Sequence, residues 1–376
     1  MNQQDLLREK RELNSFDEVR ERVETLHGLN FDDATVDMEK ISVISNEDKK
    51  KPDIMLDVPN IGQLTLTDWS RKQLGSMLGV KFDKWFDPSV IKADEMEEEI
   101  KRRFSRTRQA CKVRARRFDD DDPMNGQADG VLRALLSPSY APIDDVRIFE
   151  RMESKFRGDV EKYKFVKNHL GEDYYNDRAS HYTMACNEID MGEINMNHPD
   201  PKVSYIYKLA AAEGQLPDRD IVYQGLHLRN SEVGYTAVVI DSMMYRLVCL
   251  NGAIVNLDGG RLMYRMHRSI TDDQIDDLLD KTFSNVGETW GSQGKRLVQL
   301  HDTPLAEPRE ELVKFLERKK ATKVFQEKAL EAFNEEPLQN QYGVLQAISK
   351  AAQGVRDMER RLELEELAGQ YLAQAA

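Results

Sequence analysis

Residues 221–255 decide the fold, and they read IVYQGLHLRNSEVGYTAVVIDSMMYRLVCLNGAIV. Three apolar runs rich in β-branched residues are separated here by short polar segments, which is the pattern of antiparallel strands joined by turns. The runs cover 221–228, 235–240 and 245–250. The Asn251-Gly252 pair after the third run predicts a tight hairpin turn, because both residues tolerate positive φ angles.

The segments on either side of this stretch predict a mixture of strands and helices. Short apolar runs upstream, such as 131–136 and 182–189, indicate further strands. From Thr271 onward the pattern is helical, with Asp272 and Asp273 in a first turn. We therefore expect an α+β fold with a largely antiparallel sheet core and a C-terminal helical region. The expected divisions are an N-terminal helical segment at 1–35, an α+β core at 36–303 and the helical region at 304–376.

The C-terminal region predicts helices that need a partner surface. The expected helices cover 307–333, 338–353 and 356–375, and another is expected at 3–26 near the N-terminus. Gly343, Ala347 and Ala351 recur every four residues, so a second helix can approach this side closely. The last helix is amphipathic, and its apolar side must be covered. The cover is either the neighbouring helices of the same chain or a second subunit or partner protein.

The composition narrows the class of protein. The formal net charge is −13 and the pI is about 5.2, so any contact with nucleic acid must be local rather than spread over the surface. The apolar runs have the length of strands and predict no membrane span. The polar N-terminus predicts no secretory signal. Three cysteines far apart in the chain indicate a reducing, cytoplasmic location without a disulfide framework.

A ladder of cations stands out in this acidic chain. Every second residue from position 106 to 116 is basic, except Ala110. In an extended strand these side chains line one face about 6.6 Å apart, while Cys111, Val113 and Ala115 face inward. The ladder predicts contact with phosphates, joined by Arg133 from a neighbouring strand, and the alternatives are a structural role, with Asp119 to Asp122 neutralising the cations, or another anion. The predicted nucleic-acid-binding residues are Arg106, Arg108, Lys112, Arg114, Arg116 and Arg133.

A polar cluster interrupts the apolar strands. It begins with Asn230-Ser231-Glu232-Val233-Gly234 and continues with Arg246, Cys249, Asn251 and Gly252. One interpretation gathers Glu232, Arg246 and Cys249 around an enzymatic site, and the other is a pair of turns with a buried cysteine. The second is favoured, because no histidine nearby in sequence is placed to activate the thiol.

Neither a metal nor a cofactor is predicted. The seven histidines form no His-x-x-x-His pair, and the sequence has no Cys-x-x-Cys. Gly-x-x-x-x-Gly-Lys-Ser/Thr and Gly-x-Gly-x-x-Gly runs are also absent, which removes two common nucleotide-binding motifs. The sequence leaves enzymatic activity open but favours a protein without it.

Three stretches in order resemble an uncharacterised family of phage- and plasmid-borne proteins, known as a domain of unknown function. They are VLRALLSPSY at 131–140, NSEVGYTA at 230–237 and RLVCLNG at 246–252. The motif residues are Asn230, Ser231, Glu232, Gly234, Arg246, Cys249, Asn251 and Gly252. The resemblance implies a setting in mobile genetic elements, and phage single-strand annealing proteins are similar in outline by analogy alone.

These observations lead to two expectations of different kinds. The first is a non-catalytic DNA-metabolism protein that binds single-stranded nucleic acid in replication or recombination, strand annealing included. The second is a host-takeover or assembly adaptor that acts through protein–protein contacts, with the C-terminal helices joining a partner or a second copy of the chain. The net charge and the amphipathic tail fit both.

Overall fold

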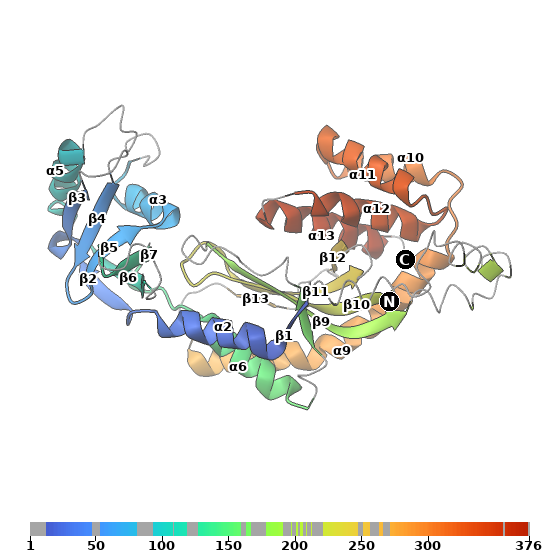
Figure 1. Cartoon of the computed structure of the whole chain (residues 1–376), viewed down its shortest axis with the longest axis horizontal. Coiled ribbons are helices and arrows are strands. Elements are labelled where there is room, and N and C mark those ends of the chain that lie inside the picture. The colour runs from blue at the N-terminus through green and yellow to red at the C-terminus, as the bar shows by residue number, and fades with distance from the viewer. Residues whose placement is uncertain are drawn as a thin grey trace.

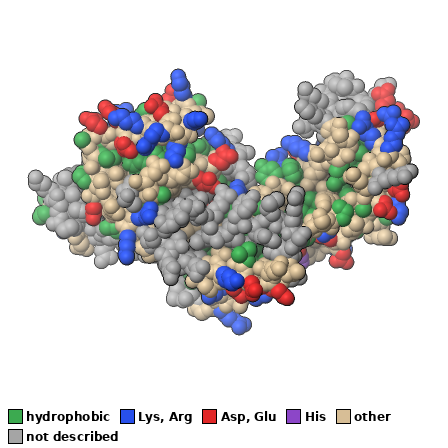
Figure 2. Space-filling model, turned by 180° about the vertical axis from the view of Figure 1, so that it is seen from behind, with side chains coloured by type: hydrophobic (Ala, Val, Ile, Leu, Met, Phe, Trp, Pro, Cys, Tyr) green, Lys and Arg blue, Asp and Glu red, His purple; other side chains and the backbone are tan. Residues whose placement is uncertain are grey.

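The computed structural model confirms an α+β fold, built on two sheets that are antiparallel except for one pair of strands (Figure 1). Seen from behind, its surface is hollowed between two lobes (Figure 2). No helix in the described part of the chain is long and apolar enough to cross a membrane. The structure describes residues 13–46, 53–80, 93–107, 109–118, 127–158, 163–166, 178–190, 221–246, 251–255, 263–265, 271–355 and 358–374, with six isolated positions between 197 and 212.

The N-terminal lobe is a six-stranded sheet with helices packed against it. Its strand order is β2-β6-β7-β5-β4-β3, and β5 and β7 form the parallel pair. Thr67 begins α3 because its side chain accepts a hydrogen bond from the backbone N–H of Ser70. The bounds are β2 Ala34–Asp37, β3 Ser42–Asn46, β4 Asp53–Val58, β5 Gly62–Leu66, α3 Asp68–Met77, α5 Ala93–Phe104, β6 Ala110–Arg117 and β7 Gly130–Leu136.

The second sheet forms the middle of the molecule. Its order is β1-β8-β9-β10-β11-β12, and β13 also pairs with β11. Helices α2, α6 and the first part of α9 pack on it and bury a core around Phe149, Phe165 and Leu226. The bounds are β1 Leu13–Ser15, α2 Phe16–Gly28, α6 Asp145–Phe156, β8 Lys164–Val166, β9 Ser180–Asp190, β10 Ile221–Asn230, β11 Val238–Arg246, β12 Asn251–Val255, β13 Met263–Arg265 and α9 Asp272–Asp302.

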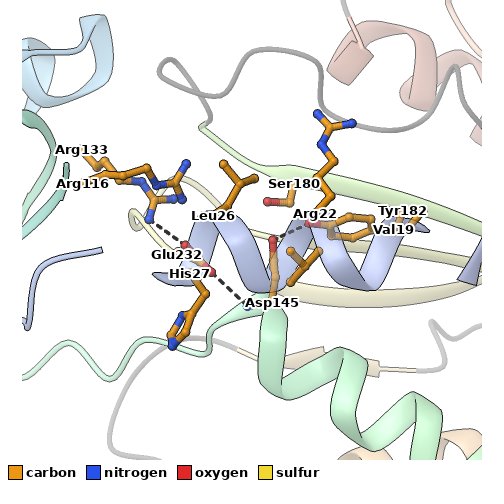
Figure 3. A pocket seen from close by; sticks show the side chains of 11 residues that line it. Val19, Arg22, Leu26, His27, Arg116, Arg133, Asp145, Ser180, Tyr182 and Glu232 are labelled. Carbon is orange, nitrogen blue, oxygen red and sulfur yellow. Dashed lines mark hydrogen bonds and ion pairs between the residues drawn. The ribbon is translucent and has the colours of Figure 1, made fainter. Parts of the chain in front are cut away.

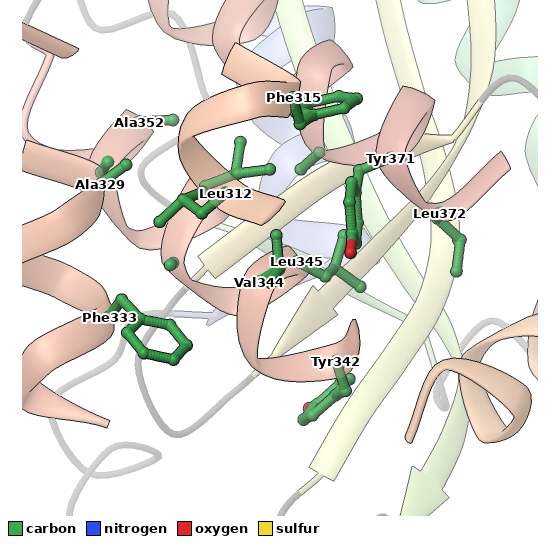
Figure 4. Packing of buried hydrophobic residues seen from close by; sticks show 14 of the residues in the cluster. Leu312, Phe315, Ala329, Phe333, Tyr342, Val344, Leu345, Ala352, Tyr371 and Leu372 are labelled. Carbon is green, nitrogen blue, oxygen red and sulfur yellow. The ribbon is translucent and has the colours of Figure 1, made fainter. Parts of the chain in front are cut away.

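The C-terminal helices pack on their own chain. Helices α12 and α13 contact β12, and one apolar cluster joins the C-terminal helices to Val222, Met244 and the end of α9 (Figure 4). Ala347 and Ala351 of the small-residue stripe are buried in this cluster. The apolar side of the last helix is thus covered within the chain. The bounds are α10 Pro308–Arg318, α11 Lys323–Glu335, α12 Gln341–Gln353 and α13 Met358–Gln374.

Three predicted boundaries are wrong. The helix expected at 307–333 is two helices, because the chain turns at Lys320, whose φ is +56°. Of the helix expected at 3–26, residues 3–12 lie outside the described residues; residues 13–15 form β1, and helix α2 begins at Phe16, where Ser15 and Glu18 form a capping box. Asn251 and Gly252 do not form the hairpin turn: they pair with Arg246 and Tyr245 as the start of β12, so the connection from β11 lies before them.

Removal of residues 304–376 tests how far the C-terminal helices belong to the fold. We expect the truncated chain to aggregate or to lose its cooperative thermal unfolding, because Val222, Met244, Leu297 and Leu300 would lose their apolar cover. Size-exclusion chromatography and a circular-dichroism melt measure both effects. A truncated chain that stays soluble and melts cooperatively would instead make the tail a separable domain.

Candidate functional site

The cationic face of β6 points toward the middle of the molecule. Cys111, Val113 and Ala115 are buried in the apolar core of the N-terminal lobe, as the alternation predicts. Arg114 and Arg116, from the other positions, are 5% and 3% exposed. A β-bulge in the pairing with β7, between Arg114 and Ala115, falls at this point of the strand. These guanidinium groups therefore need partners inside the protein.

Arg114 binds three segments that are far apart in the sequence. Its Nε lies 2.8 Å from Oδ1 of Asp33, and its Nη2 lies 2.7 Å from Oδ1 of Asp144. Its Nη1 donates to the backbone oxygen of Glu232 at 2.8 Å. Asp33 precedes β2, and Asp144 is the N-cap residue of α6. One side chain thus ties the N-terminal sheet to α6 and to the loop after β10.

Arg133 completes the connection from the neighbouring strand β7. Its Nη1 lies 2.8 Å from Oε2 of Glu232, and both side chains are 7% exposed. The amide oxygen of Asn30 accepts from Nη1 of Arg133 at 3.2 Å and from Nε of Arg116 at 3.1 Å. Asn30 therefore bridges two of the three buried arginines.

A second buried carboxylate lies beside Glu232. Oε1 of Glu232 accepts from the backbone N–H of Asp145 at 3.0 Å. The Asp145 carboxylate accepts from Asn230 Nδ2 at 2.6 Å and from the Tyr182 hydroxyl at 2.8 Å. Both acids line a cavity of about 30 Å³, together with Arg116 and Arg133 (Figure 3). That is room for roughly one water molecule. We call the charged side chains of Arg114, Arg116, Arg133, Asp33, Asp144, Asp145 and Glu232 the charge network.

The two buried carboxylates have pKa values that are moved in opposite directions. Burial alone would raise the pKa of Glu232, but Arg133, Arg114 and Arg116 together lower it to about 2. Burial and the neighbouring charge of Glu232 raise the pKa of Asp145 to about 6. Glu232 is therefore ionised at neutral pH, whereas Asp145 takes up a proton under mildly acidic conditions.

Only the second half of the predicted cationic ladder lies in a strand. Strand β6 begins at Ala110, so Arg106 lies in the turn that follows α5, where it is exposed. Lys112 is half-buried, and its Nζ donates to the backbone oxygen of Tyr140. Arg108 and the predicted counter-charges Asp119 to Asp122 lie outside the described residues. Phosphate binding by the ladder stays a prediction, but Arg114, Arg116 and Arg133 offer little surface to a phosphate.

The family-motif residues divide between the two ends of one hairpin. Asn230, Ser231 and Glu232 join the charge network or support it, and Ser231 donates to the backbone oxygen of Arg178 at 2.5 Å. Gly234 has a φ of +78°, and a Cβ there would lie 2.6 Å from a methyl carbon of Leu136. The turn predicted at 230–234 is confirmed.

Arg246 lies at the other end of the hairpin, opposite Val222 in the β10–β11 register. At about 3.4 Å per residue, it is roughly 27 Å along the strand from the Asn230 end. Asn251 and Gly252 are beside it in β12, and Cys249 lies outside the described residues. The described structure therefore does not bring Arg246 to Glu232, as the enzymatic interpretation required.

Sequence reasoning missed the residues that neutralise the arginines. Asp33 and Asp144 precede a strand and a helix, where acids are common, so neither stood out. It also missed a row of buried polar residues across the central sheet. Thr183 and Asp241 are paired with His227 from its two neighbouring strands, and Thr183 Oγ1 lies 2.9 Å from Nδ1 of His227. Only the alternation of apolar and polar residues along these strands could have indicated that row.

An aromatic and cationic surface lies beside the charge network. Tyr235 is 37% exposed, and its ring meets Trp69 of α3 edge-to-face at a centroid distance of 5.0 Å. The guanidinium of Arg178 lies 5.9 Å from the centre of the Tyr235 ring. Trp69 is fixed in turn, because its Nε1 donates to the backbone oxygen of Val233 at 2.9 Å. We call Trp69, Tyr235 and Arg178 the aromatic platform.

The described residues contain no cluster of acids, histidines and cysteines that could hold a metal ion. Comparison of the chain with protein-family models, with curated proteins and with solved structures found no match in any of the three. The resemblance to the phage- and plasmid-borne family therefore stays a prediction.

Replacing Arg114 by alanine tests whether this cation is structural. We expect the free energy of unfolding to fall by about 3 kcal/mol, because the change leaves two half-buried carboxylates and the buried backbone oxygen of Glu232 without their partner. Chemical denaturation at neutral pH measures it. Lys112→Ala is the control from the same strand: its partner is one backbone oxygen, so we expect a loss of about 1 kcal/mol. Equal, small losses for the two variants would contradict a structural role.

Asp145→Asn tests the raised pKa of this carboxylate. Because the pKa of Asp145 is raised from 3.8 to about 6, its contribution to stability is full below pH 3.8 and is lost as the pH rises through 6. Between pH 7 and 4.5 the wild type should therefore gain about 2 kcal/mol relative to the variant. Denaturation at the two pH values measures this difference.

Asp276→Asn provides the matched control for that measurement. The pKa of Asp276 is lowered to about 2, chiefly by its hydrogen bond with Arg147. Its contribution is therefore present above pH 3.8 and is lost only as the pH falls toward 2. We expect the difference between this variant and the wild type to be the same at pH 7 and pH 4.5. The assignment to Asp145 fails if both variants change alike.

Proposed function

We propose that the protein binds single-stranded nucleic acid without catalysing a reaction, and that the aromatic platform is the contact for a base. A base has a flat π face, and proteins that bind single strands stack it on exposed aromatic rings or on arginine planes. Tyr235 and Arg178 offer both surfaces within 6 Å of each other, measured from the guanidinium carbon to the ring centre. The exposure of Tyr235, beside Trp69 and Arg178, is the observation that carries the proposal.

The surroundings of the platform fit the same ligand. Lys72 is exposed on α3, three residues after Trp69, and Arg178 is exposed as well. A phosphate that follows a stacked base can contact such cations, while the acidic remainder of the protein repels long stretches of backbone. A local contact of this kind suits a chain with a net charge of −13.

The loop from Ser231 to Tyr235 gives the platform its rigidity. Glu232 is buried in the charge network, and Val233 is buried in a small apolar cluster with Ala134 and Leu136. The backbone oxygen of Val233 accepts from Trp69 and also from Gln73 Nε2 at 3.0 Å. The loop before Tyr235 is therefore fixed by Arg133, Trp69 and Gln73. A ligand then has to order less of the loop, which lowers the entropic cost of binding.

The wider setting of this function is also a proposal. A role in replication, recombination or strand annealing of a phage or plasmid, in the cytoplasm of its host, follows from the sequence resemblance and the cysteine usage. The alternative, an adaptor that docks a partner on the C-terminal helices, has less support. The apolar residues of those helices, such as Phe315 and Tyr371, pack against each other within the chain.

Tyr235→Ala tests the platform. We expect the dissociation constant for a fluorescein-labelled oligo-dT to rise roughly 5- to 100-fold, because a stacked base contributes about 1–3 kcal/mol. Fluorescence anisotropy at low salt measures the affinity. Tyr235→Phe keeps the ring and is the control, for which we expect wild-type affinity.

Trp69 gives a second readout of the same event. It contacts the Tyr235 ring, so a base that stacks there should quench part of its fluorescence. The quenched part should be absent in Trp69→Phe, which leaves Trp85 and Trp290 in place. Failure of the wild-type protein to bind labelled oligo-dT at low salt would overturn the proposed function.

A further inference from the structure

A second cationic surface lies on the hairpin between α10 and α11. Five basic residues fall within the eleven positions 318–328, where Glu327 is the single acid, and Glu317 directly precedes them. Lys and Arg side chains are visible on the upper part of the lobe on the left of Figure 2, which the C-terminal helices form. The five residues are Arg318, Lys319, Lys320, Lys323 and Lys328.

These five cations differ from those of β6 and β7 in their partners. No ion pair joins any of the five to an acid of the described residues, whereas Arg114 and Arg133 are both ion-paired and buried. Arg318 and Lys319 lie 5.9 and 5.8 Å from the ring centre of Phe315, which holds their stems against the helix. All except Lys319 are exposed. Their charge is therefore available to an external anion.

The turn that carries these cations is well defined. The backbone N–H of Lys320 donates to Glu317 at 2.9 Å, and that of Ala321 donates to Leu316 at 2.9 Å. Lys320 itself adopts a left-handed φ of +56°, which is uncommon for a residue other than glycine. Thr322 caps α11 through the backbone N–H of Phe325. The hairpin thus presents its cations from a rigid backbone.

We propose that the α10–α11 hairpin binds the phosphate backbone of the nucleic acid whose base occupies the aromatic platform. This inference rests on the proposed function and adds a second contact to it. Each phosphate that these cations neutralise releases a counterion from the nucleic acid, which favours binding. The platform would then recognise a base, while the hairpin binds phosphates without regard to sequence.

A membrane surface is a less suitable partner for these cations. Helices that bind lipid headgroups insert an apolar face into the bilayer. Here the large apolar residues of both helices, such as Leu312, Phe315 and Phe325, are buried in the C-terminal cluster. Val324, 64% exposed, is the large apolar side chain that the described part of the hairpin leaves to solvent. Because the described residues of the hairpin include exposed cations but no apolar face to insert into a bilayer, these cations favour a polyanion in solution.

The test is to neutralise three exposed cations of the hairpin and measure the salt dependence of binding. In the variant R318A/K320A/K323A, the slope of log K against log salt for oligo-dT should fall by about 2, at roughly 0.7 for each lost phosphate contact. Tyr235→Ala should lower the affinity at unchanged slope, because stacking involves no counterion release. Lys323→Glu alone is a second variant, for which the slope should fall by about 1.

The matched control removes three exposed lysines that already have partners. Lys40, Lys101 and Lys314 are ion-paired with Asp37, Glu97 and Glu310, so K40A/K101A/K314A changes the net charge equally but should keep the wild-type slope. An equal fall for both triple variants would overturn the inference, because net charge would then explain it. So would a hairpin variant that keeps the wild-type slope, while the proposed function would still stand.

Vesicles of mixed phosphatidylserine and phosphatidylcholine provide the arm for a membrane partner. We expect the wild-type protein and the hairpin variant to behave alike with these vesicles. If the hairpin variant loses vesicle binding but retains the wild-type slope with oligo-dT, the hairpin is a membrane contact and the inference is wrong. If the wild-type protein binds no oligo-dT, both proposals fail together.

Discussion

The ion pair between Arg133 and Glu232 is the contact on which the placement of the N-terminal sheet against the central sheet depends. The N-terminal sheet and the central sheet have separate apolar cores, and among the described residues a small cluster around Val233 joins them through nonpolar contacts. Beside it lies a polar connection, in which arginines from β6 and β7 contact three carboxylates and the Asn30 amide, with Asp145 next to Glu232. Burying such charges is costly, so removing one arginine leaves its carboxylate partners uncompensated. This cost favours the one placement of the two sheets in which these arginines and carboxylates meet.

The charge network also explains why two neighbouring carboxylates behave differently. Glu232 is surrounded by three guanidinium groups, which keep it ionised. Asp145, on the far side of Glu232 from Arg133, receives hydrogen bonds from Asn230 and Tyr182 but no arginine. When Asp145 takes up a proton, its repulsion with the ionised Glu232 disappears. Glu232 therefore stays ionised and paired with Arg133 over a wide pH range, while Asp145 changes its charge near pH 6.

The sequence predicted the faces of individual strands better than their partners. The period of two placed Cys111, Val113 and Ala115 in a core, and it placed Arg114 and Arg116 together on the opposite face. It gave no sign that Asp33 and Glu232 would pair with these arginines, because the acids are 81 and 99 positions from Arg114 and Arg133. Whether a cationic face meets solvent or another lobe is a question of tertiary packing. Tertiary packing also decides the register of β12, in which Asn251 and Gly252 pair with β11 and do not form the predicted hairpin turn.

The break between α10 and α11 shows why the exposed cations were harder to recognise than the buried ones. The run Arg318-Lys319-Lys320 continues a helical pattern, and it contains neither glycine nor proline to indicate a turn. The chain turns there because Phe315 and Leu316 on one side, and Phe325 and Ala329 on the other, all belong to one core. Packing these residues together requires the helices to double back, which outweighs the cost of a left-handed lysine. Folding the hairpin is thus what gathers five cations at one tip, whereas folding β6 against the central sheet removes its cations from solvent.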